Sequence, residues 1–410
     1  MVQIFTKKNI VTHNKNFMTL LLAKIVSETG NWIYYLAIIY LVAEKTKSTS
    51  STGIVLFCNI FPPIVFGIIA GHISDKFPRK NILIISDFTG GILSLYIGFR
   101  ALLGSLSIWE IYTITFLLGI SKTFFSPSIN ASIPTIVKEN ELNRANSLLQ
   151  SVSSITNILG PVCGGVIIAF IGTATAFILN GVSFIISAIC ELFVTIPYVQ
   201  NSMEGKKTYY KQIINSTSTA FQFIKTNRLI KTITLIFSIM TFFVAPMILF
   251  LQQLVDKFYN MGPVALSIIM IADSLGVLLA GLLLIIRPII KNQKLFLATF
   301  PIFCGLALII IGNVRNFYIA VITMLFQGFY SGFGEISMMT IFQRETPDYK
   351  RGMIFSLYSM IINILTPISM LASGIVLNYI PLYLILTICG LILIACSSLL
   401  IKNLFFVKTD

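Results

Sequence analysis

Long hydrophobic runs, separated by short polar segments, make up most of the chain. A helix needs about 20 apolar residues to cross the hydrocarbon core of a bilayer, and twelve runs are of roughly that length. The pattern therefore predicts an all-α membrane protein with twelve transmembrane helices. These spans lie near residues 16–42, 51–70, 82–104, 108–125, 147–170, 173–195, 229–251, 262–286, 295–312, 317–340, 352–377 and 380–401.

The longest polar segment, Pro197–Arg228, lies between the sixth and seventh predicted spans. It divides the chain into two halves of equal span number. We therefore predict an N-terminal six-helix bundle at residues 1–196, a linker at 197–228 and a C-terminal six-helix bundle at 229–410.

The two halves also repeat a pattern of arginine and proline positions. The repeated positions are Ile133-Pro134, Arg144 and Gly160-Pro161 in the first half, and Thr346-Pro347, Arg351 and Thr366-Pro367 in the second. Any two membrane halves share a hydropathy rhythm, but the nearly equal offsets favour a true repeat. A six-plus-six repeat is typical of secondary transporters whose halves move about a central site, so we expect a cavity where the bundles meet.

Composition supports a membrane location. Hydrophobic residues make up 56% of the chain and charged residues 11%, against about 25% charged in soluble domains, and the mean hydropathy is +0.89. These values exclude an ordinary soluble enzyme, a disordered chain and a nucleic-acid-binding domain, despite a net charge of +14. Most Lys and Arg residues fall on one side of the predicted spans, which by the positive-inside rule places both termini and the linker in the cytoplasm of a cell-membrane protein.

The chain lacks the sequence signals of several chemistries. Its six cysteines lie in apolar runs without a C-x-x-C pair, so we expect buried thiols and neither a disulfide framework nor a metal site. No G-x-x-x-x-G-K-[ST] pattern is present, which excludes a P-loop for ATP hydrolysis. We therefore expect no enzyme activity and no cofactor, and uphill transport would need an ion gradient.

The loop after the second span reads Gly-His-Ile-Ser-Asp-Lys-Phe-Pro-Arg-Lys, from Gly71 to Lys80. Gly71 would let two helices approach closely, and Asp75 would cap a neighbouring helix or pair with a cation. Lys76, Arg79 and Lys80 would hold the loop inside. A plain positive loop explains the three cations but not Gly71 and Asp75 at their spacing, so we interpret the segment as a gating loop.

The fifth span contains Gly160-Pro161-Val-Cys-Gly164-Gly165. Glycine permits close helix packing and proline bends a helix. The motif is therefore either part of the coupling machinery or a helix kink with no bearing on coupling.

These motifs resemble those of the major facilitator superfamily. The loop is similar to its cytoplasmic signature, and the Gly-Pro segment resembles the antiporter motif of its drug:proton exporters, with Thr156 where that motif has glycine. Further stretches resemble the macrolide-efflux branch, namely those within Ser27–Ala37, Gly119–Ser147 and Gln343–Ser356. The resemblance implies a twelve-helix transporter that exports a drug in exchange for protons by alternating access.

The first span carries a polar stripe. Glu28 lies near its middle, Lys24 is one turn earlier, and Asn31 and Tyr35 continue the same face. Ionisable residues within a membrane are costly and are candidate functional residues. We predict that Glu28 is a protonatable carboxylate in the central cavity, with Lys24 tuning it; the alternative is a closed structural ion pair. Trp32 and Tyr35 are candidates to stack against a substrate, or else pack the bundle.

The C-terminal half carries two acids within its spans. Asp273 lies near the middle of the eighth span, which has no cation to offset it. Glu335 lies in the inner part of the tenth span, after Gln327 and Tyr330. We predict that Asp273 and Glu335 are coupling candidates, with Gln327 and Tyr330 beside the substrate, and that Asp273 faces the central cavity opposite the first-span acid.

Further charged residues within the spans of the N-terminal half include Asp87, Lys122 and Glu191. We expect Asp87 to pair with nearby loop cations and Glu191 to reach interfacial water. Lys122, near the inner end of the fourth span, would form an ion pair with either Glu335 or Glu191.

The sequence thus favours a monomeric, proton-coupled exporter of a hydrophobic or amphiphilic small molecule such as an antibiotic. The alternative is export of an endogenous product such as a siderophore, peptide or lipid-like metabolite, for which Lys24 and Lys122 would bind an anionic group. A non-transporting sensor is disfavoured because the segment Pro197–Arg228 is too short to form an added domain.

Overall fold

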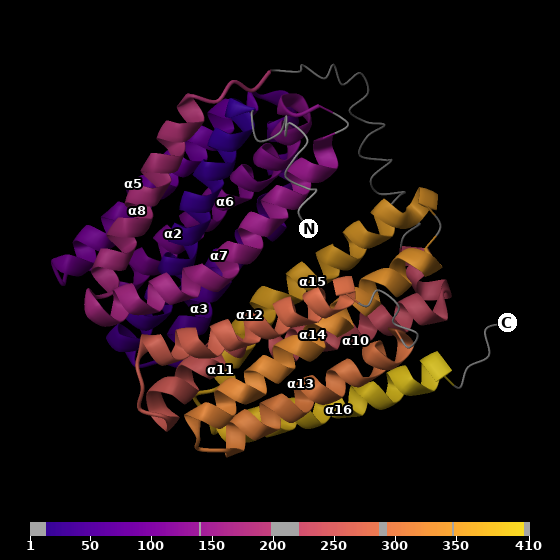
Figure 1. Cartoon of the computed structure of the whole chain (residues 1–410). Coiled ribbons are helices and arrows are strands. Elements are labelled where there is room, and N and C mark those ends of the chain that lie inside the picture. The colour runs from indigo at the N-terminus through magenta and orange to yellow at the C-terminus, as the bar shows by residue number, and fades with distance from the viewer. Residues whose placement is uncertain (1–13, 139–140, 198–220, 287–292, 347, 406–410) are drawn as a thin grey trace. The chain divides into compact units, whose positions relative to one another are not determined.

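The computed structural model describes residues 14–138, 141–197, 221–286, 293–346 and 348–405. These residues are nearly all helical and contain no strand (Figure 1). The chain divides into two compact units, Met1–Ser202 (unit 1) and Met203–Asp410 (unit 2). Most of the predicted linker lies outside the described residues.

Each of the twelve predicted spans corresponds to helical structure. Unit 1 contains α2 (Lys15–Thr46), α3 (Thr49–Ile60), α4 (Pro62–Lys76), α5 (Arg79–Leu102), α6 (Ile108–Ile136), α7 (Leu142–Phe170) and α8 (Thr173–Leu192). Unit 2 contains α10 (Arg228–Val244), α11 (Met247–Gln253), the π-helical turn η3 (Leu254–Phe258), α12 (Pro263–Ile286), α13 (Gln293–Asn313), α14 (Phe317–Glu345), α15 (Asp348–Val376) and α16 (Leu382–Phe405).

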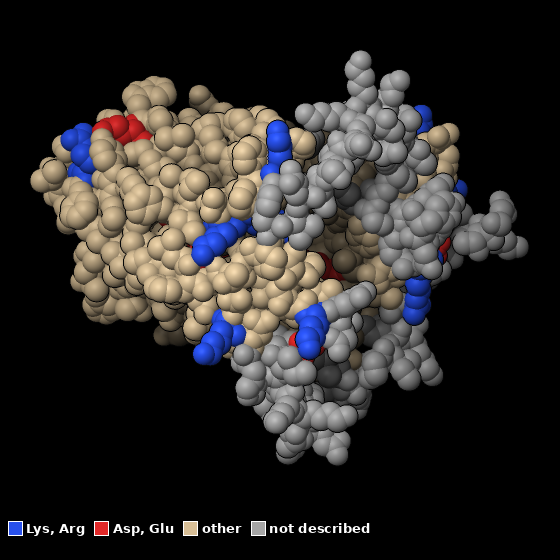
Figure 2. Space-filling view, turned by 90° about the horizontal axis from the view of Figure 1, so that it is seen from above, with Lys and Arg blue, Asp and Glu red and all other residues tan. Residues whose placement is uncertain are grey.

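Ten helical segments of the described residues are long and apolar enough to cross a membrane, and Leu382–Ser398 is a shorter apolar helix. The 29-residue α6 occupies the position of the fourth predicted span. The surface has the corresponding character, because most of the face in Figure 2 consists of uncharged residues with scattered Lys and Arg side chains. The prediction of an all-α, multi-pass membrane protein is confirmed.

Two of the predicted spans are broken rather than continuous. The second is divided between α3 and α4, where Pro62 begins the new helix. The seventh is divided after α10 by Pro246, which precedes α11. Proline has no amide hydrogen and its ring clashes with the preceding turn, so it ends or kinks a helix. Hydropathy alone does not reveal such breaks.

The helices pack in the same pairs in both units. In unit 1, α2 contacts α7 and α8, α5 contacts α6 and α8, and α4 contacts α6. In unit 2, α10 contacts α15 and α16, α13 contacts α14 and α16, and α12 contacts α14. The 29-residue helices α7 and α15 contain Pro161 and Pro367 at the same distance from their first residues. This correspondence supports the internal repeat.

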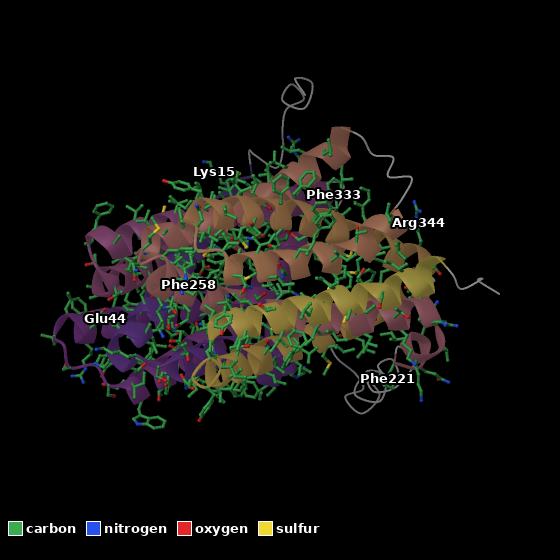
Figure 3. All side chains as sticks on the ribbon, turned by 90° about the horizontal axis from the view of Figure 1, so that it is seen from below. Lys15, Glu44, Phe221, Phe258, Phe333 and Arg344 are labelled. Carbon is green, nitrogen blue, oxygen red and sulfur yellow. The ribbon has the colours of Figure 1, made fainter. Side chains whose placement is uncertain are left out.

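Helix α2 organises unit 1. It extends from Lys15 to beyond Glu44, which lie toward its two ends (Figure 3). Phe17, Leu36 and Ile39 are fully buried, so one side of the helix belongs to the apolar core. The other side carries the polar stripe, which is thereby turned toward the interior cavity of unit 1 described next.

Candidate functional site

A cavity of about 540 Å³ lies within unit 1. Its charged lining residues are Lys24, Glu28, Asp87 and Lys122, and asparagines of α2, α3, α6, α7 and α8 add polar groups. Those asparagines are Asn31, Asn59, Asn130, Asn157 and Asn180. The volume is within the range of small-molecule sites, about 300–1,000 Å³.

The Glu28 carboxylate is fully partnered. It forms an ion pair with Lys24, and the two side chains are 28% and 16% exposed, respectively. From α7, the Ser153 hydroxyl donates to it at 3.2 Å and the Thr156 hydroxyl at 3.0 Å. A carboxylate that accepts several hydrogen bonds and faces an ammonium is stabilised in its charged form. The arrangement gives the Glu28 carboxylate a cation on α2 and two hydroxyl donors on α7.

The aromatic residues of α2 lie beside this carboxylate. The Trp32 indole N–H donates to Asn157 Oδ1 at 3.1 Å, and its ring meets Tyr35 edge to face at a centroid distance of 5.9 Å. Both rings and Asn31 line the cavity. The three predicted substrate-cavity residues of the first span are therefore together, on an amphipathic wall that offers both ring faces and amide groups.

The glycines of α7 bring that helix against α2. A Cβ atom at Gly160 would lie 2.5 Å from the Trp32 side chain, and one at Gly164 would lie 3.0 Å from Leu36. Pro161 lies inside the continuous helix α7, and Gly165 is buried next to Gly164. Because the close approach seats α7 beside Trp32, the Gly-Pro motif shapes the wall of the cavity.

Unit 2 holds its acids differently. Asp273 on α12 and Glu335 on α14 lie close enough to repel each other electrostatically. Asp273 is half-buried and its buried Oδ1 has no hydrogen-bond partner, while Glu335 is exposed. No ion pair joins either acid to a Lys or Arg within the described part of the chain. Two neighbouring carboxyl groups without a cation favour the binding of a proton.

The packing of α12 against α14 fixes the position of Asp273. A Cβ atom at Gly328 would overlap the Asp273 backbone, and one at Gly276 would overlap the Leu325 carbonyl. The two backbones are therefore in contact. The Gln327 amide, one residue before Gly328, contacts Cys304 Sγ of α13 at 3.7 Å.

Tyr330 stacks on Phe303, with centroids 3.4 Å apart and an interplanar angle of 11°. Phe329 meets Tyr330 edge to face, so the ring is held between aromatic neighbours of α13 and α14. Gln327 is buried and Tyr330 is half-buried, and both connect α14 to α13. Their place beside a substrate stays a prediction.

Comparison with known proteins identifies the family. Residues 20–370 match the Major Facilitator Superfamily. The chain belongs to the major facilitator superfamily. It is therefore a transporter of small molecules rather than an enzyme.

Relatives within the superfamily include exporters. Macrolide efflux protein A of Streptococcus pyogenes is 24% identical over 364 residues, which cover 87% of this chain and 88% of that protein. Multidrug efflux pump Tap of Mycolicibacterium fortuitum is 22% identical over 370 residues, which again cover 87% and 88%. A POT family transporter solved in complex with 5-aminolevulinic acid shares the fold, with a TM-score of 0.78 at 10% identity over 99% of this chain and 100% of that one.

The superfamily loop signature of this transporter ties helix ends together. Arg79 donates to the Ala131 carbonyl of α6 at 2.6 Å, and Lys80 donates to the Leu192 carbonyl at the end of α8 at 2.7 Å. The Lys76 ammonium lies 5.9 Å from the Phe77 ring centroid. Cations near the carbonyl end of a helix are favourable. Arg79 and Lys80 therefore connect the loop to the carbonyl ends of α6 and α8.

The other two residues of the signature have different outcomes. A Cβ atom at Gly71 would meet nothing within 4 Å, so the expected close helix approach there is wrong for this structure. The side chain of Asp75 lies outside the described residues, and its gating role stays a prediction.

The expectations for Asp87 and Glu191 are wrong. Asp87 is 3% and Glu191 1% exposed, so Glu191 does not reach water. Neither forms an ion pair among the described residues, because Arg79 and Lys80 are directed to backbone carbonyls instead. Lys122 lines the unit 1 cavity with Lys24 and does not pair with Glu191.

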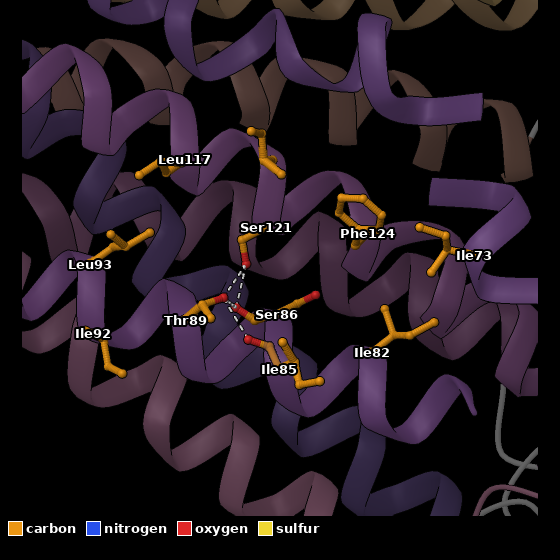
Figure 4. A pocket seen from close by; sticks show the side chains of 11 residues that line it. Ile73, Ile82, Ile85, Ser86, Thr89, Ile92, Leu93, Leu117, Ser121 and Phe124 are labelled. Carbon is orange, nitrogen blue, oxygen red and sulfur yellow. Dashed lines mark hydrogen bonds between the residues drawn. The ribbon is translucent and has the colours of Figure 1, made fainter. Parts of the chain in front are cut away.

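A second pocket, of about 520 Å³, opens between α5 and α6 (Figure 4). Its walls are mostly Ile, Leu and Phe side chains, and its hydroxyl groups belong to Ser86, Thr89 and Ser121. The Ser121 hydroxyl is hydrogen-bonded to the Ser86 carbonyl and lies 3.4 Å from that of Thr89. Since no charged group lines this pocket, it offers no coupling chemistry.

Ser153 and Asn157 of α7 were not among the predicted site residues. Ser153 hydrogen-bonds to Glu28, and Asn157 accepts a hydrogen bond from Trp32. Thr156 was identified only as a departure from the glycine of the antiporter motif. That departure was the available signal, because a hydroxyl in place of glycine adds a hydrogen-bond donor to a packed helix face.

Proposed function

We propose that this superfamily member exports a hydrophobic or amphiphilic small molecule by proton antiport across the cell membrane, with both termini in the cytoplasm. Its efflux relatives, the macrolide exporter and the multidrug pump, support export of a drug-like compound. The unit 1 cavity supports the same class of substrate, because it combines aromatic rings with amide groups.

The observation that carries proton coupling is the Asp273–Glu335 pair of unit 2. An uncompensated carboxylate within a membrane is costly, so the pair is stabilised by binding a proton. A proton that enters from outside would occupy this pair, and its release to the cytoplasm would accompany the return step. Glu28, which is paired with Lys24, would orient the substrate instead.

Antiport requires that proton and substrate each weaken the binding of the other. In our proposal, substrate binding favours the form of unit 2 in which the pair has lost its proton. The hydrogen bonds of Arg79 and Lys80 to helix carbonyls would keep unit 1 rigid during that exchange, and Asp75 would govern the conformational step.

The test is proton exchange in everted membrane vesicles that carry the full chain, with erythromycin as the substrate. A respiratory pH gradient is established and followed with a pH-sensitive dye. We expect erythromycin to dissipate part of the gradient, because each exported molecule returns protons. Vesicles without the protein are the background.

A gradient that erythromycin leaves unchanged, while ethidium or another amphiphile dissipates it, would keep proton antiport and change the substrate. A gradient that no tested amphiphile dissipates, in vesicles that still take up erythromycin down its concentration gradient, would contradict proton coupling.

A further inference from the structure

A second pair of acids lies deep in unit 1, on helices that do not carry Glu28. Asp87 belongs to α5 and Glu191 to α8. The two helices pack tightly, since a Cβ atom at Gly91 would lie 2.7 Å from Ile185, and one at Gly181 would lie 2.6 Å from Leu95. This packing places the two carboxyl groups within electrostatic range of each other.

The pair has no compensating partner in the described structure. Both carboxyl oxygens of Glu191 and Oδ2 of Asp87 are buried without a hydrogen-bond partner. Ser187, one turn before Glu191, lies beside Asp87. Lys80, in the first turn of α5, donates to the carbonyl of Leu192 rather than to either acid.

The charged cavity residues Lys24 and Glu28 of α2 pair with each other, and Lys122 of α6 lines the same cavity as Asp87. His72 and Lys76 occupy the last turns of α4, and Arg144 the first turn of α7. None of these forms an ion pair with Asp87 or Glu191 within the described residues.

Two adjacent carboxylates in an apolar interior repel each other and lose their hydration. A single proton removes one charge and creates an O–H donor, which the remaining carboxylate can accept. One hydrogen bond then partners Asp87 Oδ2 and one of the two carboxyl oxygens of Glu191. No other group in the described part of unit 1 supplies such a donor to Glu191.

We propose that Asp87 and Glu191 form a proton-binding site that holds one proton between their carboxyl groups. Glu191 carries the proton and donates it to Asp87 Oδ2. Because Asp87 lines the unit 1 cavity, the proton leaves to water in that cavity and returns by the same route. This site is separate from the Asp273–Glu335 pair, and it does not depend on the proposed antiport.

The first test is the pH dependence of thermal stability for the purified full-length protein. A folded state that binds more protons than the unfolded state loses stability as the pH rises through the titration of the site. We expect the apparent melting temperature of the wild type to fall at alkaline pH and Glu191→Gln to reduce that fall, because glutamine mimics the protonated acid. The matched control is Glu44→Gln, an exposed acid near the end of α2, which should keep the wild-type profile.

A Glu191→Gln profile that falls as steeply as those of the wild type and Glu44→Gln would overturn the proposal. The same measurement with sodium or potassium in place of choline tests for a metal cation at the site. We expect no change, and a cation-dependent rise in melting temperature that Glu191→Gln abolishes would replace the proton with that cation.

Infrared spectroscopy of the protonated carboxyl groups supplies a readout that does not depend on stability. We expect Glu191→Gln to remove the carboxylic-acid signal of the pair at neutral pH, because Glu191 carries the proton. Asp87→Asn should shift the frequency of that signal without removing it, because the acceptor changes from a carboxylate to an amide. If each substitution removed half of the signal lost by the double variant, two protons would be held independently and the sharing would be refuted. If neither removed any signal, the site would hold no proton.

Discussion

In unit 1, Glu28 is ion-paired with Lys24 and accepts hydrogen bonds from Ser153 and Thr156. In unit 2, Asp273 packs against Gly328 of α14, has an unpartnered buried oxygen, and lies within electrostatic range of Glu335. The two units share their helix pairing, so the difference arises from side chains and not from the fold. The same helix arrangement carries a cation-paired acid in unit 1 and, among the described residues, an acid without a cation in unit 2.

Glu28 and Asp273 look alike in the sequence, but the structure surrounds them differently. The Glu28 carboxylate is compensated by an ammonium, whereas a half-buried carboxylate without a cation is stabilised by binding a proton. We therefore propose that unit 2 couples transport to protons and that the Glu28 region of unit 1 recognises the substrate. The following variants test this assignment of functions to the two units.

The largest effect is expected from Asp273→Asn, which keeps the shape of the side chain but cannot titrate. Everted vesicles should lose uphill erythromycin accumulation by at least about a hundredfold, equivalent to about 2.7 kcal/mol, while downhill movement continues. Glu345→Gln, an exposed acid at the end of α14, is the control and should accumulate normally. Uphill accumulation by Asp273→Asn at the wild-type level would place the coupling elsewhere.

Removing one member of the unit 1 ion pair should destabilise the fold. Lys24→Met leaves the Glu28 carboxylate without its cation, and we expect the free energy of unfolding to fall by about 2 kcal/mol. The double variant Lys24→Met/Glu28→Gln removes both charges and should recover most of that loss. The measurement is a double-mutant cycle by detergent-induced unfolding. Purely additive losses would show that the two side chains are not coupled.

A smaller effect is expected from the hydroxyl that replaces the motif glycine. Thr156→Val keeps the branched shape but removes the donor to Glu28, which should lower the free energy of unfolding by about 1–2 kcal/mol. Thr156→Ser retains the donor and serves as the control. Equal stability of the valine and serine variants would mean that this hydrogen bond does not hold the carboxylate.

The smallest effect concerns the loop cations. Lys80→Met removes the contact with the Leu192 carbonyl at the end of α8, and we expect a loss of about 0.5 kcal/mol in the free energy of unfolding. Lys225→Met, at an exposed position before α10, should change nothing. A loss of unfolding free energy as large as that of Lys24→Met would show that the Lys80 contact matters as much as the ion pair for the stability of unit 1.

Hydrophobic run length was sufficient to predict the helices, because a membrane requires long apolar segments. The stripe of Lys24, Glu28, Asn31 and Tyr35 was also predictable, since residues three and four apart share a helix face. The site of unit 1 follows from that stripe together with its neighbours on α7.

The partners of these residues were not predictable from the pattern. Ser153 and Thr156 are more than 120 positions from Glu28, so their contact depends on how α2 packs against α7. The isolation of Asp87 and Glu191 likewise depends on Lys80 reaching a backbone carbonyl instead of an acid. Local spacing contains no information about such tertiary choices.

The division between the units is tested most directly by counting protons released when erythromycin binds to purified protein in weakly buffered solution. We expect the wild type to release protons and Asp273→Asn to bind erythromycin without releasing them. The charge-neutral pair variant Lys24→Met/Glu28→Gln should still release protons for each molecule bound. Undiminished release by Asp273→Asn, or loss of release in the pair variant with binding retained, would show that unit 2 is not the coupling unit.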